Sequence, residues 1–101
     1  MKSYFVYMLF CFDGTFYIGV TNNLERRIGE HNFGIDPECY TFNRRPLVLA
    51  WSEEFAWITD AIDVEKKLKR WSHAKKSALA RGDWKMIASL AKGRTRRTLS
   101  P

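Results

Sequence analysis

The fold is decided by YFVYMLFCFDGTFYIGV, residues 4–20. Two runs rich in aromatic and β-branched residues flank an Asp-Gly dipeptide at 13–14, which is typical of a hairpin turn, so the stretch predicts two antiparallel strands. The length of the loop sets the register. If residues 12–14 form a three-residue loop with the glycine in the left-handed conformation, Cys11 pairs with Thr15.

Side-chain alternation decides between loop lengths. Because successive side chains point to opposite faces of a sheet, a one-residue change in register exchanges the two faces. The three-residue loop puts Tyr7 and Tyr17 on one face, whereas a two-residue turn would separate them. It also gathers an apolar set on the opposite face: Val6, Met8, Phe10, Phe16, Ile18 and Val20. We therefore predict the three-residue loop, with both tyrosines on one face.

A helix is expected directly after the hairpin. Asn22 is a favourable N-cap residue, and Glu25 three residues later completes a capping-box pattern. At about 100° per residue, one face of this helix carries Leu24, Ile28 and His31. Arg27 lies at the edge of that face, one turn before His31, and Arg26 points to solvent.

The later segments complete an α+β domain. LVLAW, residues 47–51, predicts a third strand, and helices are expected at about 59–71, 72–82 and from 83 to the stop at Gly93. The expected N-caps of these helices are Thr59, Ser72 and Asp83. The order β-β-α-β-α-α-α predicts a three-stranded antiparallel β-sheet flanked by helices.

Length and charge limit the possible functions. The 101 residues suffice for one domain with a single core, which we expect at 1–93, followed by a basic flexible tail at 94–101. The net charge of +6 favours a polyanionic partner, with nucleic acid ahead of a membrane surface. Cys11 and Cys39 belong to no CxxC pair, which argues against a zinc site or a disulfide scaffold.

The compartment follows from the same features. Unpaired thiols indicate a reducing cytoplasm. The apolar N-terminal run lacks a small-residue cleavage pattern and is shorter than the ~20 residues of a membrane span. We therefore expect a cytoplasmic protein without membrane contact, and a monomer.

Glu65 is the most informative position on the helix after the third strand. The apolar stripe of that helix consists of Ile58, Ala61, Val64, Leu68 and Trp71. Glu65 falls within about 60° of Leu68, inside the stripe. A carboxylate facing a core is costly unless it is paired, hydrogen-bonded or bound to a metal. Glu65 is therefore either half of an internal ion pair, for which Arg27 is the candidate partner, or a metal ligand.

Several functional side chains fall on elements that adjoin one small sheet. Taken singly, each has an ordinary structural explanation, such as a cross-strand contact for a tyrosine or a helix-dipole contact for a histidine. The set consists of Tyr7, Tyr17, Arg27, His31 and Glu65. Together these groups suit phosphoryl chemistry, where developing charge on oxygen needs a cation and a metal.

The spacing of these residues resembles that of a known family. FVY at 5–7, YIG at 17–19 and NLERR at 23–27, followed by His31, resemble the GIY-YIG nuclease superfamily, and most closely its small stand-alone bacterial members. The likeness is strong over residues 4–32. It continues less specifically through the third strand and the glutamate-bearing helix, about four fifths of the chain in all.

The resemblance implies metal-dependent hydrolysis of DNA phosphodiester bonds. It assigns catalytic roles to Tyr7, Tyr17, Arg27 and His31, and it makes Glu65 the ligand of one Mg²⁺ or Mn²⁺, held largely through water. No small-molecule cofactor is implied. Tyr17 is the first choice to orient or deprotonate the attacking water, and the group that takes the proton stays open.

Several positions bear on whether the protein is catalytically active. Phe5 replaces the first glycine of the family pattern, and Val20 stands where excision-repair members carry a lysine. No asparagine follows Asn43, whereas many active members use one beyond the metal glutamate; Asn32 and Ser72 are the available substitutes. The missing asparagine supports an alternative, a nucleic-acid-binding module of the same fold with little or no catalysis.

Gly19 fits the pattern because a missing side chain lets the backbone or a phosphate approach closely. For DNA contacts, Arg44 and Arg45, just before the third strand, are the first phosphate candidates, joined by Lys69 on the later helix. A charge run such as 66–76 is otherwise typical of a solvated helix face.

We expect an endonuclease acting on DNA, with branched or damaged structures, as in DNA repair, among its candidate substrates. A second alternative is a protein-interaction domain in which Arg27 and Glu65 form a structural ion pair.

Overall fold

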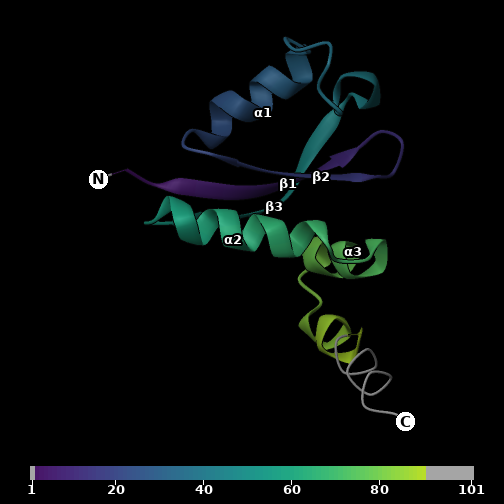
Figure 1. Cartoon of the computed structure of the whole chain (residues 1–101). Helices are drawn as coiled ribbons and strands as arrows, with labels where there is room; N and C mark the ends of the chain where they lie inside the picture. The colour runs from purple at the N-terminus through teal and green to yellow at the C-terminus, as the bar shows by residue number, and fades with distance from the viewer. Residues whose placement is uncertain (1, 91–101) are drawn as a thin grey trace. The chain divides into compact units, whose positions relative to one another are not determined.

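The computed structural model describes residues 2–90 of the chain. Its elements are β1 (Tyr4–Cys11), β2 (Phe16–Thr21), α1 (Leu24–Phe33), the 3₁₀ turn η1 (Phe42–Arg44), β3 (Leu47–Phe55), α2 (Ile58–Lys69) and α3 (His73–Arg81) (Figure 1). Residues 84–90 are also helical. The α+β class and the element order are confirmed. The expected helix stop at Gly93 and the tail at 94–101 lie outside the described residues.

The chain divides into two compact units, one ending at Arg70 and the other beginning at Trp71. The sheet, α1 and α2 belong to the first unit, and α3 belongs to the second. No helix among the described residues is long and apolar enough to cross a membrane.

The sheet is antiparallel, with strand order β2-β1-β3. Phe10 pairs with Phe16, and the Cys11 amide donates to the Thr15 carbonyl at 2.9 Å. Gly14 has φ +86°, in the left-handed region that favours glycine. The predicted three-residue loop is therefore confirmed, and with it the placement of both tyrosines on one face.

The central strand β1 is buried on both of its faces. On one side Tyr7, Leu9 and Cys11 form a cluster against which Leu24 and Ile28 of α1 pack. On the other side Val6 and Met8 are fully buried, and α2 contacts both β1 and β2. Figure 1 shows α1 and α2 on opposite sides of the sheet.

Two expected helix starts are wrong by one or two residues. The N-cap of α1 is Asn23, whose side chain accepts from the Arg26 amide at 3.1 Å, and not Asn22. The Thr21 hydroxyl accepts from the Asn23 amide, which holds this start in place. With Asn23 as the cap, the N3 position is Arg26 and not Glu25, so the expected capping box does not form. Helix α2 begins before the expected cap at Thr59, because the Ala61 amide already bonds the Trp57 carbonyl.

The later caps agree with the sequence. The Ser72 side chain accepts from the Lys75 amide, and α3 ends at Gly82 with φ +68°. The Asp83 carboxylate accepts from the Met86 amide at the start of the next helical segment. Strand β3 is longer than predicted, because its polar end pairs with β1 as far as Phe55 opposite Tyr4.

Candidate active site

Tyr7 and His31 form the buried centre of the candidate site. Tyr7 is 1% and His31 4% exposed, and the Tyr7 hydroxyl lies 2.9 Å from His31 Nε2. Tyr17 packs beside them, with its ring edge-on to His31 at 5.1 Å between centroids. Strands β1 and β2 and helix α1 therefore bring three of the predicted catalytic residues together.

Gly19 makes room for the Tyr7 ring. The two residues face each other across β1 and β2. A Cβ at Gly19 would lie 2.5 Å from the Tyr7 hydroxyl oxygen and 2.6 Å from Cζ, closer than real Cβ contacts allow. The space beside Gly19, which was expected to admit a backbone segment or a phosphate, is therefore filled by the Tyr7 ring.

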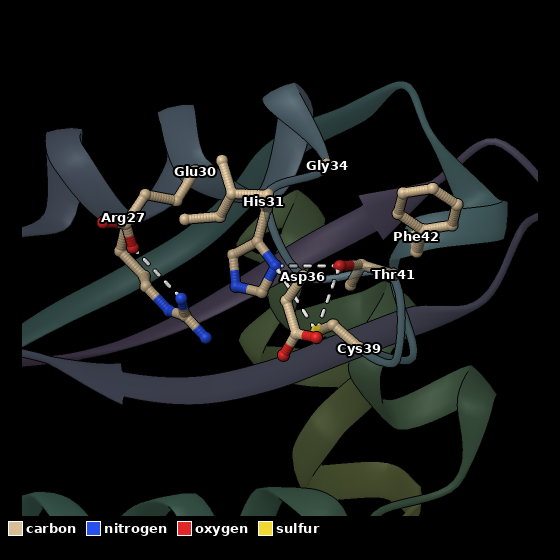
Figure 2. A pocket seen from close by; sticks show the side chains of 9 residues that line it. Arg27, Glu30, His31, Gly34, Asp36, Cys39, Thr41 and Phe42 are labelled. Carbon is tan, nitrogen blue, oxygen red and sulfur yellow. Dashed lines mark hydrogen bonds and ion pairs between the residues drawn. The ribbon is translucent and has the colours of Figure 1, made fainter.

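Arg27 lies at the edge of this cluster. Its Nη1 forms an ion pair with Glu30 Oε1 at 3.1 Å, as Figure 2 shows. Burial alone would lower the pKa of Arg27, but hydrogen bonding with Tyr7 and Glu30 raises it. The guanidinium therefore stays charged, and its side chain is 35% exposed, so it can reach a bound phosphate.

Both phenols are held in the neutral form. Burial raises the pKa of Tyr7 to about 12, although hydrogen bonding with Arg27 opposes the rise. Burial also raises the pKa of Tyr17, and the nearby charge of Glu65 adds to this effect while Arg27 opposes it. At pH 7 about 0.001% of a phenol with pKa 12 is ionised. Neither tyrosine is therefore a base already formed in the resting protein.

The other ring nitrogen of His31 meets residues of the segment that follows α1. His31 Nδ1 lies 2.8 Å from Thr41 Oγ1 and 3.9 Å from Cys39 Sγ (Figure 2). A pocket of about 10 Å³, the room of a single water, opens here between Arg27, His31, Cys39 and Thr41. Thr41 is not among the site residues predicted from the sequence, and no periodic pattern marks it.

His31 is expected to make stability depend on pH. Burial, and then the charge of Arg27, lower the pKa of His31, with Glu30 opposing. An unfolded histidine titrates near 6.5, so just below that pH the unfolded chain binds a proton that the folded chain does not. The free energy of unfolding should therefore fall as pH decreases from 7.5 to 5.5.

Urea titrations at the two pH values measure this difference. A His31→Gln variant should lose most of the pH dependence that wild type shows. An unchanged pH dependence in the His31 variant would contradict the assignment.

Glu65 lies on α2 within electrostatic range of Tyr17. Its side chain is 19% exposed, and Oε2 is 3.3 Å from Lys69 Nζ. Arg27 pairs with Glu30 instead, so the considered Arg27–Glu65 ion pair is not formed. The neighbour that compensates this carboxylate is one turn away on the same helix.

The donor set at Glu65 fits a hard cation. Among the described residues no three His, Cys, Asp or Glu side chains converge, so the arrangement differs from a closed zinc site. Mg²⁺ keeps several waters and binds one or two carboxylates together with substrate phosphate. Glu65, whose partner Lys69 is 56% exposed and easily displaced, meets that requirement.

Arg44 and Arg45, the two arginines before β3, anchor the segment that connects α1 to β3. Arg44 Nε lies 3.0 Å from Asp13 Oδ2, and its guanidinium stacks 3.7 Å from the Tyr40 ring centre. Tyr40 in turn stacks on Tyr17 at 6.1 Å. Arg45 Nε donates to the Phe42 carbonyl at 2.8 Å. That Arg44 and Arg45 contact DNA stays a prediction.

Both candidate substitutes for the missing late asparagine are engaged in structural hydrogen bonds. Asn32 Nδ2 donates to the Leu47 carbonyl at 3.0 Å, and its Oδ1 accepts from the Leu47 amide at 2.8 Å. Its amide group therefore ties α1 to the start of β3. The Ser72 hydroxyl accepts from the Lys75 amide as the cap of α3.

Comparison with known proteins identifies the family. Residues 3–78 match the family model of the GIY-YIG catalytic domain. This chain belongs to the GIY-YIG family. The resemblance to this nuclease superfamily is thus confirmed, and with it the strand and helix order that carries the tyrosines, Arg27 and His31.

Relatives of this GIY-YIG chain are small proteins. A UPF0213 protein of Halobacterium salinarum is 42% identical over 74 residues, which cover 73% of this chain and 95% of the relative. A UPF0213 protein of Desulfotalea psychrophila is 35% identical over 88 residues, or 87% of this chain and 80% of the relative. These names state no reaction.

Two solution NMR structures share the GIY-YIG chain's fold. The UPF0213 protein BH0048 of Bacillus halodurans matches with a TM-score of 0.51 and 34% identity, over 78% of this chain and 83% of the other. The protein EF2693 of E. faecalis matches with a TM-score of 0.57 and 32% identity, over 81% and 86%.

Proposed function

We propose that this GIY-YIG protein is a metal-dependent endonuclease that hydrolyses DNA phosphodiester bonds. The observation that supports it most is the hydrogen-bonded Tyr7–His31 pair, with Tyr17 and Arg27 beside it and Glu65 in range. A permanent cation can stabilise the charge that builds up when water attacks a phosphate in line, and neutral phenol and imidazole groups can orient that water and take up its proton.

Arg27 stabilises the phosphate in the proposed reaction. Water attacks phosphorus and the bond to the 3′ oxygen breaks, so charge builds up on the non-bridging oxygens. The Arg27 guanidinium is partly exposed and held by Glu30, which keeps it aimed at the cluster. Donors fixed in advance in this way stabilise the transition state without a reorganisation cost.

The tyrosines and His31 handle the water and its proton. Tyr17 is the less buried of the two phenols and orients the attacking water. Tyr7 is a neutral phenol whose hydroxyl touches His31 Nε2. Because burial lowers the pKa of His31, its imidazole is neutral near pH 7 and can receive a proton passed through the Tyr7 hydroxyl.

Glu65 would hold one Mg²⁺ or Mn²⁺, largely through water. Such an ion would supply positive charge that stabilises the negative charge developing in the reaction. Lys69, which pairs with Glu65 at 3.3 Å, would then be released toward the DNA backbone. Arg44 and Arg45 are the other proposed phosphate contacts, supported by the net charge of +6.

We also propose a substrate class, an oligomeric state and a cellular compartment. Branched or damaged DNA are its candidate substrate classes, and the protein acts as a monomer in DNA repair. The free thiols Cys11 and Cys39 support a reducing cytoplasm.

A second candidate is a DNA-binding module with little catalysis. The observation that favours it is the engagement of Asn32 by the Leu47 backbone and of Ser72 by α3. Neither side chain can take the place of the asparagine that many active GIY-YIG members use.

Cleavage of a DNA panel separates the candidates. Purified protein is incubated at low salt with duplex, single-stranded, flapped and four-way DNA, in Mg²⁺, Mn²⁺ or EDTA. We expect cleavage with either metal and none in EDTA. Salt-sensitive binding without cleavage under every metal condition would favour the binding module, and absence of both would overturn both candidates.

A further inference from the structure

We propose that Thr41 is a positioning residue of this site, which fixes the orientation and the tautomer of His31. This inference rests on the proposed nuclease function for its catalytic consequence, but the geometry that carries it stands apart from that function. Thr41 belongs to neither a strand nor an α-helix of the site.

Thr41, His31 and Tyr7 form a buried chain of hydrogen bonds. Thr41 Oγ1 lies 2.8 Å from His31 Nδ1, and His31 Nε2 lies 2.9 Å from the Tyr7 hydroxyl. Thr41 and Tyr7 are each 1% exposed and His31 is 4% exposed. Bulk water therefore has little access to these groups beyond the single-water pocket beside Cys39, and their main hydrogen-bond partners are one another.

The position of Thr41 in the chain supports a role outside local structure. Thr41 is the N-cap of η1, where a threonine hydroxyl ordinarily accepts from a backbone amide. Its side chain makes no such capping bond. The hydroxyl is turned instead toward His31, ten residues earlier on α1.

The proton arrangement follows from the partners of Tyr7. As a neutral phenol, Tyr7 carries a hydroxyl hydrogen that needs an acceptor. Its charged neighbour Arg27 donates only and cannot accept. His31 Nε2, 2.9 Å away, is then the acceptor. A neutral imidazole with a bare Nε2 carries its hydrogen on Nδ1.

Thr41 completes this arrangement. Its Oγ1 accepts the Nδ1 hydrogen of His31, and its own hydrogen can point to Cys39 Sγ at 3.4 Å. Without the hydroxyl, Nδ1–H would be buried beside a sulfur 3.9 Å away, and the ring would gain by turning or by moving its hydrogen to Nε2. Either change removes the acceptor that faces Tyr7.

Thr41→Val and Thr41→Ser form a matched pair for the test. Valine keeps the shape and removes the hydroxyl, whereas serine keeps the hydroxyl. Nitrogen-15 NMR of the imidazole in wild type should show a hydrogen on His31 Nδ1 and a bare Nε2. The valine variant should show the Nε2–H tautomer, and the serine variant should match wild type.

DNA cleavage is the second readout. We expect Thr41→Val to lower kcat by about 10- to 100-fold with KM for DNA nearly unchanged, and Thr41→Ser to stay within about threefold of wild type. Urea unfolding confirms that each variant is folded under the assay conditions. If the valine variant does not fold, the tautomer of His31 in wild type and in the serine variant decides the question.

The outcomes separate this inference from the proposed function. A bare Nδ1 on His31 in wild type overturns the inference whatever the activity, as does a fully active and folded valine variant. If wild type cleaves no DNA, the nuclease proposal fails, while a hydrogen on Nδ1 that valine displaces and serine retains still supports the positioning role of Thr41.

Discussion

Glu65→Gln is expected to lower DNA cleavage by about 10²- to 10³-fold while leaving the fold intact. Glutamine has nearly the same shape as glutamate but lacks the charge that holds a divalent cation. The competing explanation is that Glu65 serves only its ion pair with Lys69, at 3.3 Å. That pair has an exposed partner, so its loss should change the free energy of unfolding by less than about 1 kcal/mol.

The control for Glu65→Gln lies on the same helix. Asp63→Asn removes one carboxylate charge from an exposed position of α2, and it should leave cleavage unchanged. The rate is measured on the preferred DNA at several Mg²⁺ concentrations, beside urea unfolding of each variant. Equal cleavage by Glu65→Gln and wild type at every concentration would exclude Glu65 as the metal ligand.

The part of the site that the sequence predicted depends on regular patterns. Alternation along β1 and β2 was sufficient to place Tyr7 and Tyr17 on one face, because a register error would have mixed that face with the apolar one. Helical phase likewise placed His31 inside and Arg27 at the edge. These relations follow from the geometry of single elements and do not require knowledge of the loops.

The part that the sequence missed depends on irregular backbone and on competing local partners. Thr41 reaches His31 only because the irregular segment after α1 returns to the end of that helix, and no periodicity encodes that path. Arg27 was a candidate partner for Glu65, but Glu30, three residues along α1, competes successfully at 3.1 Å. Asn32 was a candidate substitute for the missing late asparagine, but it bonds both backbone groups of Leu47.

Strand β3 shows a similar limit. Its end, Ser52 to Glu54, has a polar composition without strand propensity, and pairing with the first residues of β1 extends the strand. Tertiary hydrogen bonding thus overrode the local pattern.

Gly19→Ala is expected to lower cleavage by about 10²-fold or more, although it adds only one methyl group. The new Cβ would lie 2.5 Å from the Tyr7 hydroxyl oxygen, so the ring must move. Tyr7 is 1% exposed, and the clash involves the ring end and not a flexible chain, so relief requires movement of the whole ring. The displaced ring loses the 2.9 Å contact with His31, and this overpacking should cost about 1–3 kcal/mol of stability.

Gly29→Ala is the matched control for the Gly19 substitution. Gly29 lies on α1, and a Cβ there meets no atom within 4 Å, so alanine should stabilise the helix by up to about 1 kcal/mol and leave cleavage intact. Rates are compared at a temperature where urea unfolding shows every variant to be folded, which removes stability as the cause. Full activity of folded Gly19→Ala would show that the position of the Tyr7 hydroxyl does not limit the reaction, and the Tyr7–His31 pair would then lose its proposed role as proton acceptor.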